Sequence, residues 1–261
     1  MSDARSPTCD RCGGTGFIIL EGDGVSRARP CGCRRRPGEP AGAQALLEIA
    51  RVPPRYRECE FENFDAYGRS AFSLAAAKSV AARYVEEYPL NDSGLLFMGP
   101  PGVGKTHIAV ATLRRLMLEK GVPCLFCDVQ DLLRQLQATF DRQSGMSQLE
   151  LLQPVLSIEV VLLDDLGGRQ FSPWLEETLA HIVTTRYNER KATLVTTNYL
   201  DRPGEARTPT LGDRIGPRVR SRLHEMCHLV LIEAPDFRME VKRADHYPVP
   251  TRTPPRTEGQ P

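Results

Sequence analysis

The sequence has almost no net charge, few lysines and no long apolar run, and these shortages exclude several classes of protein. Its 34 Lys+Arg against 33 Asp+Glu leave a formal charge of +1. This balance excludes a uniformly basic DNA-coating protein and an acidic tail protein, but it allows a local basic face. Only five of the basic residues are lysines, a skew that indicates genomic codon bias.

No apolar run approaches the ~18 residues that a membrane-spanning helix needs. Residues 1–7 are polar and lack the apolar stretch of a secretory signal. We therefore expect a cytoplasmic protein, in a reducing compartment and without membrane contact.

Composition divides the 261-residue chain into four parts. Residues 1–40 are rich in Gly, Pro, Arg and Cys, and they are too poor in large apolar groups to form a core unaided. Residues 41–66 are a connector with a short helix expected at 43–50. Residues 67–246 have the residue patterning of a folded core. Residues 247–261 carry five prolines and are expected to be a disordered tail.

The core shows short apolar segments that alternate with helical segments. Strands are expected at 95–98, 123–129, 160–163, 193–197 and 228–232. Helices are expected at 106–119, 131–140, 148–156, 173–190 and 211–226. Continuous apolar strands alternating with helices predict an α/β fold, in which a parallel sheet is covered by helices on both faces.

An alanine-rich helix is expected before this alternation, at residues 68–87. Its apolar residues recur at a spacing of four, and they are expected to form the buried stripe. This stripe comprises Phe72, Ala76, Val80, Tyr84 and Tyr88.

A glycine-rich loop joins the first expected strand of the alternation to its helix. Its residues match the pattern G-x-x-x-x-G-K-[ST] in the strand–loop–helix context that the pattern requires. They are Gly99, Pro100, Pro101, Gly102, Val103, Gly104, Lys105 and Thr106. Glycines let the backbone amides curl around phosphates, and the helix N-terminus favours negative charge. Lys105 is expected to reach the β- and γ-phosphates and Thr106 to bind Mg²⁺, so ATP and Mg²⁺ are the expected cofactors.

Two acidic residues follow the apolar segment at 160–163, about 60 residues after the loop. Asp164 is expected in the Mg²⁺ shell, and Asp165 is expected to polarise the attacking water. Asn198 follows the strand at 193–197 and would reach the γ-phosphate if that strand lies beside the strand at 160–163. Tyr199 stands where a guanine-specifying N-K-x-D motif needs lysine, which disfavours a GTPase. A small-molecule kinase stays open, although no lid or substrate motif stands out.

Seven segments in order resemble one known family, the DnaC/DnaI/IstB group of AAA+ ATPases in the initiator clade. They are VPPRYR at 52–57, FENFD at 61–65, the loop at 99–106, LLDDLG at 162–167, RY at 186–187, TTN at 196–198 and SRL at 221–223. The resemblance covers about residues 45–240. It implies a P-loop AAA+ core that assembles on single-stranded DNA as a ring or spiral, with ATP sites between subunits.

Further roles follow from the resemblance alone. Arg222 matches the family's arginine finger, which acts in a neighbouring subunit's ATP site, and Arg238 matches the region of sensor 2. Residues 131–153 stand where initiator-type members insert helices that contact DNA, with Arg134 and Arg142 as candidates. For each arginine, a plain surface position remains the alternative.

Four of the eight cysteines fall within the first 33 residues, at Cys9, Cys12, Cys31 and Cys33. In a reducing compartment this clustering favours a metal over disulfides. Four thiolates suit tetrahedral Zn²⁺, which would supply the folding energy that this segment lacks. The second pair is one residue shorter than usual, so an iron–sulfur cluster or a redox pair stays open. The sequence predicts a small N-terminal zinc module, and similar modules in DnaI-like loaders contact the replicative helicase.

Two further cysteines, Cys124 and Cys127, lie on an expected strand. Residues three apart on a strand face opposite sides, so these two cannot share one metal. They are expected to be buried thiols, and Cys59 and Cys227 are expected to be structural too.

The resemblance and the cysteines together predict an ATP-dependent helicase loader in DNA replication. Such a protein hydrolyses ATP, binds single-stranded DNA, associates with its own copies and recruits a replicative helicase. An IstB-like helper of a transposase shares the same core and stays open. A non-hydrolysing zinc DNA-binding adaptor is a further alternative.

Overall fold

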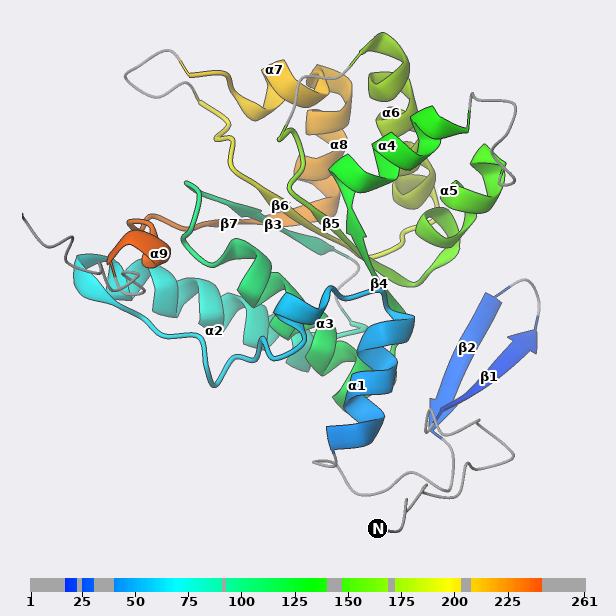
Figure 1. Ribbon diagram of the computed structural model, residues 1–261, viewed down its shortest axis with the longest axis horizontal. Helices are drawn as coiled ribbons and strands as arrows, with labels where there is room; N and C mark the ends of the chain where they lie inside the picture. Colours follow the sequence, from blue (N-terminus) through cyan, green and yellow to red (C-terminus); the bar gives the residue numbers. More distant parts are fainter. Residues whose placement is uncertain are drawn as a thin grey trace, which may run out of the picture.

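The fold is described by a computed structural model that covers residues 17–22, 25–30, 40–90, 93–139, 147–168, 172–202 and 208–240. Its centre is a parallel sheet in the order β4-β5-β6-β3-β7, with helices on both faces (Figure 1). The strands are β3 (Gly94–Met98), β4 (Cys124–Asp128), β5 (Val160–Asp164), β6 (Thr193–Thr197) and β7 (Cys227–Leu231). The expected α/β architecture is confirmed, and each expected strand lies within two residues of its observed bounds.

Helices fill the connections between the strands. They are α1 (Pro40–Ile49), α2 (Ala71–Glu87), α3 (Lys105–Lys120), α4 (Val129–Ala138), α5 (Gln148–Ser157), α6 (Pro173–Asn188), α7 (Leu211–Ile215), α8 (Pro217–Met226) and α9 (Phe237–Glu240). In Figure 1, α1, α2 and α3 lie on one side of the sheet, and α4 to α8 lie on the other. Short 3₁₀ turns occur at Pro54–Tyr56 and Gly68–Ser70.

The sheet separates two apolar cores, because successive strand residues point to opposite faces. Leu95 and Phe97 of β3 pack into the core with α2 and α3. Leu96 and Met98 pack into the core with α4, α5, α6 and α8. Every residue of β3, β5 and β6 is buried, which explains why these strands are continuous apolar runs rather than alternating ones.

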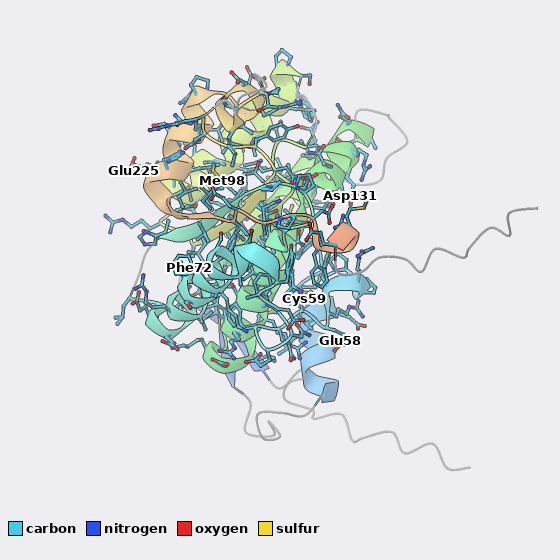
Figure 2. All side chains as sticks on the ribbon, turned by 90° about the vertical axis from the view of Figure 1, so that its left-hand side faces the viewer. Glu58, Cys59, Phe72, Met98, Asp131 and Glu225 are labelled. Atoms are coloured by element: carbon cyan, nitrogen blue, oxygen red, sulfur yellow. The ribbon has the colours of Figure 1, made fainter. Side chains whose placement is uncertain are left out.

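The expected buried stripe of α2 is confirmed at Tyr84 and Tyr88, which are buried, and wrong at Phe72 and Ala76, which are exposed. The helix buries Leu74, Ala77, Ala81, Tyr84 and Val85, whereas Phe72 is 87% exposed. A spacing of four residues turns 400° around a helix, so a row of such residues drifts off one face, and a core stripe needs spacings of three as well as four. Figure 2 labels Phe72 on α2, outside the helix's buried face.

Two expected helices have different bounds. The helix expected at 211–226 is interrupted at Gly216, whose φ of 78° and ψ of 152° are not helical, and Pro217 begins α8. The helix expected at 131–140 begins two residues earlier, because Asp128 caps α4 by accepting a hydrogen bond from the amide of Asp131.

The scattered cysteines behave as expected. Cys124 and Cys127 are buried and free, and they lie in the two different cores on opposite faces of β4. Within the described ranges there is no cluster of three or more His, Cys, Asp or Glu side chains placed to hold a metal. No helix in those ranges is long and apolar enough to span a membrane.

The predicted zinc module lies largely outside the described residues, as do its expected ligands Cys9, Cys12, Cys31 and Cys33 and the tail at 247–261. Between the two cysteine pairs, β1 (Phe17–Gly22) and β2 (Val25–Pro30) form an antiparallel hairpin. Its register pairs Phe17 with Pro30, so the two ends of the hairpin that lead to the cysteine pairs lie side by side.

Candidate ATP-binding site

The glycine-rich loop lies at the carboxyl end of β3 and leads directly into α3, as its sequence context predicts. Gly104 has a φ of +94°, and a Cβ there would lie 2.7 Å from Cε2 of Phe64. Gly102 has a φ of +78°, and a Cβ there would collide with the carboxylate of Asp236. Both positions therefore require glycine for backbone conformation and for space. Phe64 belongs to the FENFD segment, so that segment supports the loop from outside.

Lys105 is buried at the start of α3, with its side chain turned back into the loop. Its Nζ donates to the carbonyl oxygens of Gly99 at 2.8 Å and Pro100 at 2.7 Å. Burial lowers the pKa of Lys105 to about 8, and the charges of Asp165 and Asp164 oppose that change. An ammonium held in this way can exchange carbonyl partners for phosphate oxygens, which would bind it more strongly.

Asp164, the last residue of β5, is buried beside the loop. Its Oδ1 accepts hydrogen bonds from Oγ1 of Thr106 at 2.9 Å and Oγ1 of Thr196 at 2.6 Å. Burial raises the pKa of Asp164, and the two hydroxyls act against this. The expected pair of Mg²⁺ ligands, Thr106 and Asp164, is thus brought together from two neighbouring elements. A hydroxyl and a carboxylate in contact are hard oxygen donors of the kind that Mg²⁺ prefers.

Asp165 follows in a left-handed conformation, with φ of 54°, which is uncommon for a residue other than glycine. Its Oδ1 accepts from Nδ2 of Asn198 at 2.9 Å, and its amide donates to Oγ1 of Thr196 at 2.9 Å. Burial, and next the charge of Asp128, raise the pKa of Asp165. Because β6 pairs with β5, Asn198 lies beside the acidic pair, as the sequence predicts.

Sequence reasoning gave no role to Thr196, although its hydroxyl contacts both acidic residues. It donates to Asp164 and accepts from the amide of Asp165, so it fixes the two acids relative to each other. A polar residue in a strand whose every residue is buried was the available signal.

Arg222 does not contact the loop or the two acids of its own chain in the described structure. Its guanidinium lies 5.9 Å from the ring centre of Tyr187, and its Nη1 reaches the carbonyl of Arg218 at 3.4 Å. Its buried Nε has no partner among the described residues. This placement suits a residue that acts outside its own site.

Two other arginines of the 214–222 segment have interaction partners within the chain. Arg214 stacks on the ring of Tyr199 at 4.6 Å, and Arg220 pairs with Asp201 at 2.8 Å.

Arg238 lies on α9, next to a segment that packs on the loop. The amide of Phe237 donates to the carbonyl of Gly102 at 3.1 Å, and the amide of Arg238 donates to Oδ1 of Asp236 at 2.8 Å. The positive charge of Arg238 contributes to the lowered pKa of Lys105. The expected sensor-2 arginine is therefore exposed but within electrostatic range of the loop.

Comparison with known proteins agrees with this geometry. Residues 43–245 match the family described as IstB-like ATP binding protein. The replicative helicase loader DnaC of Escherichia coli K12 is 31% identical over 177 residues, which cover 68% of this chain and 69% of that relative. A crystal structure of the DnaC helicase loader has a TM-score of 0.60 and 35% identity, and the match covers 69% of this chain and 99% of that one.

A more distant structure supports the fold alone. The crystal structure of DnaI has a TM-score of 0.55 at 22% identity, and it covers 71% of this chain and 93% of that one. The family resemblance drawn from the ordered motifs is thus confirmed. The chain belongs to the family of IstB-like ATP binding proteins, with an AAA+ P-loop fold and homology to the DnaC helicase loader.

Proposed function

We propose that this protein is an ATP-dependent loader of a replicative helicase, which binds ATP and Mg²⁺ and holds single-stranded DNA. The observation that carries the proposal is the 31% identity to a replicative helicase loader over 68% of the chain. The geometry of the loop, the two acids and Asn198 supports it, because these residues form a nucleotide site at the carboxyl end of a parallel sheet.

Hydrolysis of ATP follows from the roles that these side chains can take. Lys105 and the loop amides would hold the phosphates, and Thr106 and Asp164 would hold Mg²⁺, which would supply positive charge beside the phosphate oxygens. Asp165 accepts a hydrogen bond from the attacking water and aligns it, and Asn198 orients that carboxylate. Arg222 of a neighbouring copy supplies the arginine finger, which requires that copies associate through their ATP sites.

The zinc module is part of the proposal. Cys9, Cys12, Cys31 and Cys33 would hold Zn²⁺, and the module at 1–40 would recruit the helicase. The hairpin of β1 and β2 supports this, because it places Phe17, five residues after Cys12, opposite Pro30, which directly precedes Cys31. Four thiolates from two such pairs are a common structural zinc site.

Single-stranded DNA would lie against residues 131–153, which include most of α4 and the first part of α5. Arg134 is exposed on α4 and pairs there with Asp131 at 3.4 Å. Contact with backbone phosphates would make binding depend strongly on salt.

An IstB-like helper of a transposase is the second candidate. The family that matches residues 43–245 is named for IstB, which favours this candidate. A loader and a transposase helper share this core. A non-hydrolysing adaptor is the third, and it differs by the absence of ATP turnover.

The test is co-purification of the full-length protein with the hexameric replicative helicase, and separately with a transposase, each from the same organism. The proposal expects capture of the helicase, and capture of the transposase alone would replace it with the second candidate. A variant without residues 1–40 that still captures the helicase would refute the role of the zinc module. ATP turnover absent both with and without single-stranded DNA would favour the adaptor.

A further inference from the structure

Gln130, in the first turn of α4, connects this helix to the catalytic acid of the proposed site. Its Nε2 donates to the main-chain carbonyl oxygen of Asp165 at 3.4 Å. Its Oε1 is buried and has no hydrogen-bond partner among the described residues. A long hydrogen bond and an unpaired buried acceptor leave this amide under-satisfied, and such a group needs an explanation in a buried site.

Asp165 depends on side chains from other elements for its orientation. Its carbonyl accepts from Gln130 and from the amide of Gly168 at 3.3 Å, its amide donates to Thr196, and its carboxylate accepts from Asn198. The residue also has a φ of 54°, a conformation that persists only where the surroundings hold it. Removal of the bond from Gln130 leaves the carbonyl of Asp165 with the amide of Gly168 as its partner, so the position of Asp165 is less tightly fixed.

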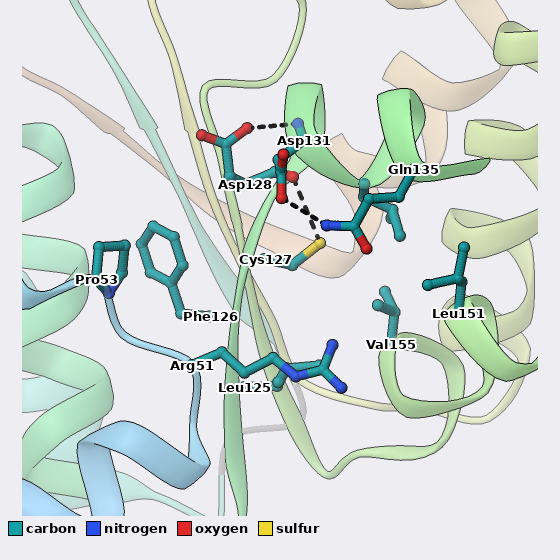
Figure 3. A pocket seen from close by; sticks show the side chains of 11 residues that line it. Arg51, Pro53, Leu125, Phe126, Cys127, Asp128, Asp131, Gln135, Leu151 and Val155 are labelled. Atoms are coloured by element: carbon teal, nitrogen blue, oxygen red, sulfur yellow. Dashed lines mark hydrogen bonds between the residues drawn. The ribbon is translucent and has the colours of Figure 1, made fainter. Parts of the chain in front are cut away.

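The helix that carries Gln130 begins as one capped unit. Oδ1 of Asp128 accepts from the amide of Asp131 at 2.9 Å, and Oδ2 of Asp131 accepts from Nε2 of Gln135 at 2.6 Å (Figure 3). A displacement of this first turn thus carries Gln130 with it. Asp128 is also the last residue of β4, opposite Asp164 in the sheet register.

A pocket of about 160 Å³ lies beside the same turn, between β4, α4 and α5 (Figure 3). Asp128, Asp131, Leu132 and Gln135 line it on the side of α4, and Leu151 and Val155 line it from α5. The first turn of α4 is therefore not enclosed on this side, and it has room to shift.

We propose that Gln130 is a positioning residue, which ties Asp165 to α4 so that a shift of α4 changes the rate of ATP hydrolysis and not the affinity for ATP. This inference rests on the proposed function, in which Asp165 aligns the attacking water and single-stranded DNA lies against α4 and α5. It makes α4 the element through which bound DNA stimulates turnover.

The test replaces Gln130 by methionine, which keeps the length of the side chain but removes the donor. Gln137→Met is the matched control, because Gln137 is exposed on the same helix and lies outside the capped first turn. Steady-state ATPase kinetics are measured with and without single-stranded DNA, together with the Kd for MgATP. We expect kcat to fall about tenfold in Gln130→Met, as for a small misplacement of a catalytic group. Its KM and Kd stay within about twofold of wild type, and DNA stimulation is lost. The control keeps the wild-type kcat, KM and Kd in the absence of DNA.

A second variant and a double-mutant cycle make the test sharper. Gln130→Glu keeps the size and polarity but cannot donate, and it is expected to repeat the loss. In an Asp165→Asn background, Gln130→Met is expected to add no further loss, because Gln130 acts only through Asp165. Full kcat in both Gln130 variants, a parallel rise in KM, or an additive loss in the cycle overturns the inference. Absence of turnover in the wild-type protein refutes the proposed function itself, which distinguishes the two failures.

Discussion

Burial of Lys105 predicts that affinity for MgATP falls as pH rises above 8. The pKa of this ammonium is lowered to about 8 in the free protein. Bound phosphates favour the charged form, so the pKa rises on binding and protons are taken up above pH 8. For a pKa of about 8, binding takes up about 0.1 proton at pH 7 and about 0.8 at pH 8.5. The apparent Kd then weakens roughly tenfold between pH 7.5 and pH 9.

Titration calorimetry in two buffers of different ionisation enthalpy measures both quantities. Lys105→Arg is the matched control, because a guanidinium stays charged over this range, and its binding is expected to be weaker but independent of pH. Lys105→Ala is expected to lose binding at every pH. An equal Kd at pH 7.5 and pH 9 in the wild-type protein, without proton uptake, would refute the reasoning from burial.

Four further predictions concern other parts of the chain. Arg222→Ala is expected to keep the Kd for MgATP and to lower kcat about 10³-fold. Normal turnover in this variant would show that another arginine is the finger, and Arg218→Ala would then be tested. Arg186→Met is expected to cost about 3 kcal/mol in urea unfolding, because the fully buried guanidinium donates to four main-chain carbonyls; an unchanged midpoint would contradict this. Gly104→Ala is expected to abolish binding measured by the same calorimetry, since its Cβ meets Phe64, and wild-type affinity would exclude that clash. Cys9→Ser is expected to reduce the zinc content measured by elemental analysis from one ion per chain to none, and zinc retained in this variant would show that Cys9 is not a ligand.

Strand positions were predictable, because strands buried on both faces need continuous apolar runs. The bounds expected for β6 are those observed, and those of β5 differ by one residue. The interruption at Gly216 was missed although a signal existed. A glycine followed by proline ends one helix and begins the next, since Pro217 fits the first turn of a helix. The buried face of α2 was predicted only in part for a different reason. The spacing of apolar residues does not show which of two neighbouring faces of the helix meets the sheet.

Some residues of the site were predictable from the sequence, and others were not. Lys105 and Thr106 lie in one local motif, and Asp164 and Asp165 end one apolar run, so their roles follow from neighbouring residues. Gln130 was not predictable, because its contact with Asp165 spans 35 residues and depends on where α4 begins relative to β5. Such contacts follow from the sheet order and the helix cap, and single-sequence patterns do not contain them.

Hydrogen bonds within the protein explain how the loop tolerates a buried lysine beside the buried Asp164 and the half-buried Asp165. Lys105 donates to two loop carbonyls, and Thr106 donates to Asp164. On binding of MgATP, Lys105 would exchange those carbonyls for phosphate oxygens, and Thr106 and Asp164 would hold Mg²⁺. Thr196 donates to Asp164 and accepts from the amide of Asp165, so it would keep the two acids in their relative position during this exchange. For this reason Lys105 variants are expected to change affinity while the fold persists, whereas Arg186 variants are expected to lower the stability of the fold.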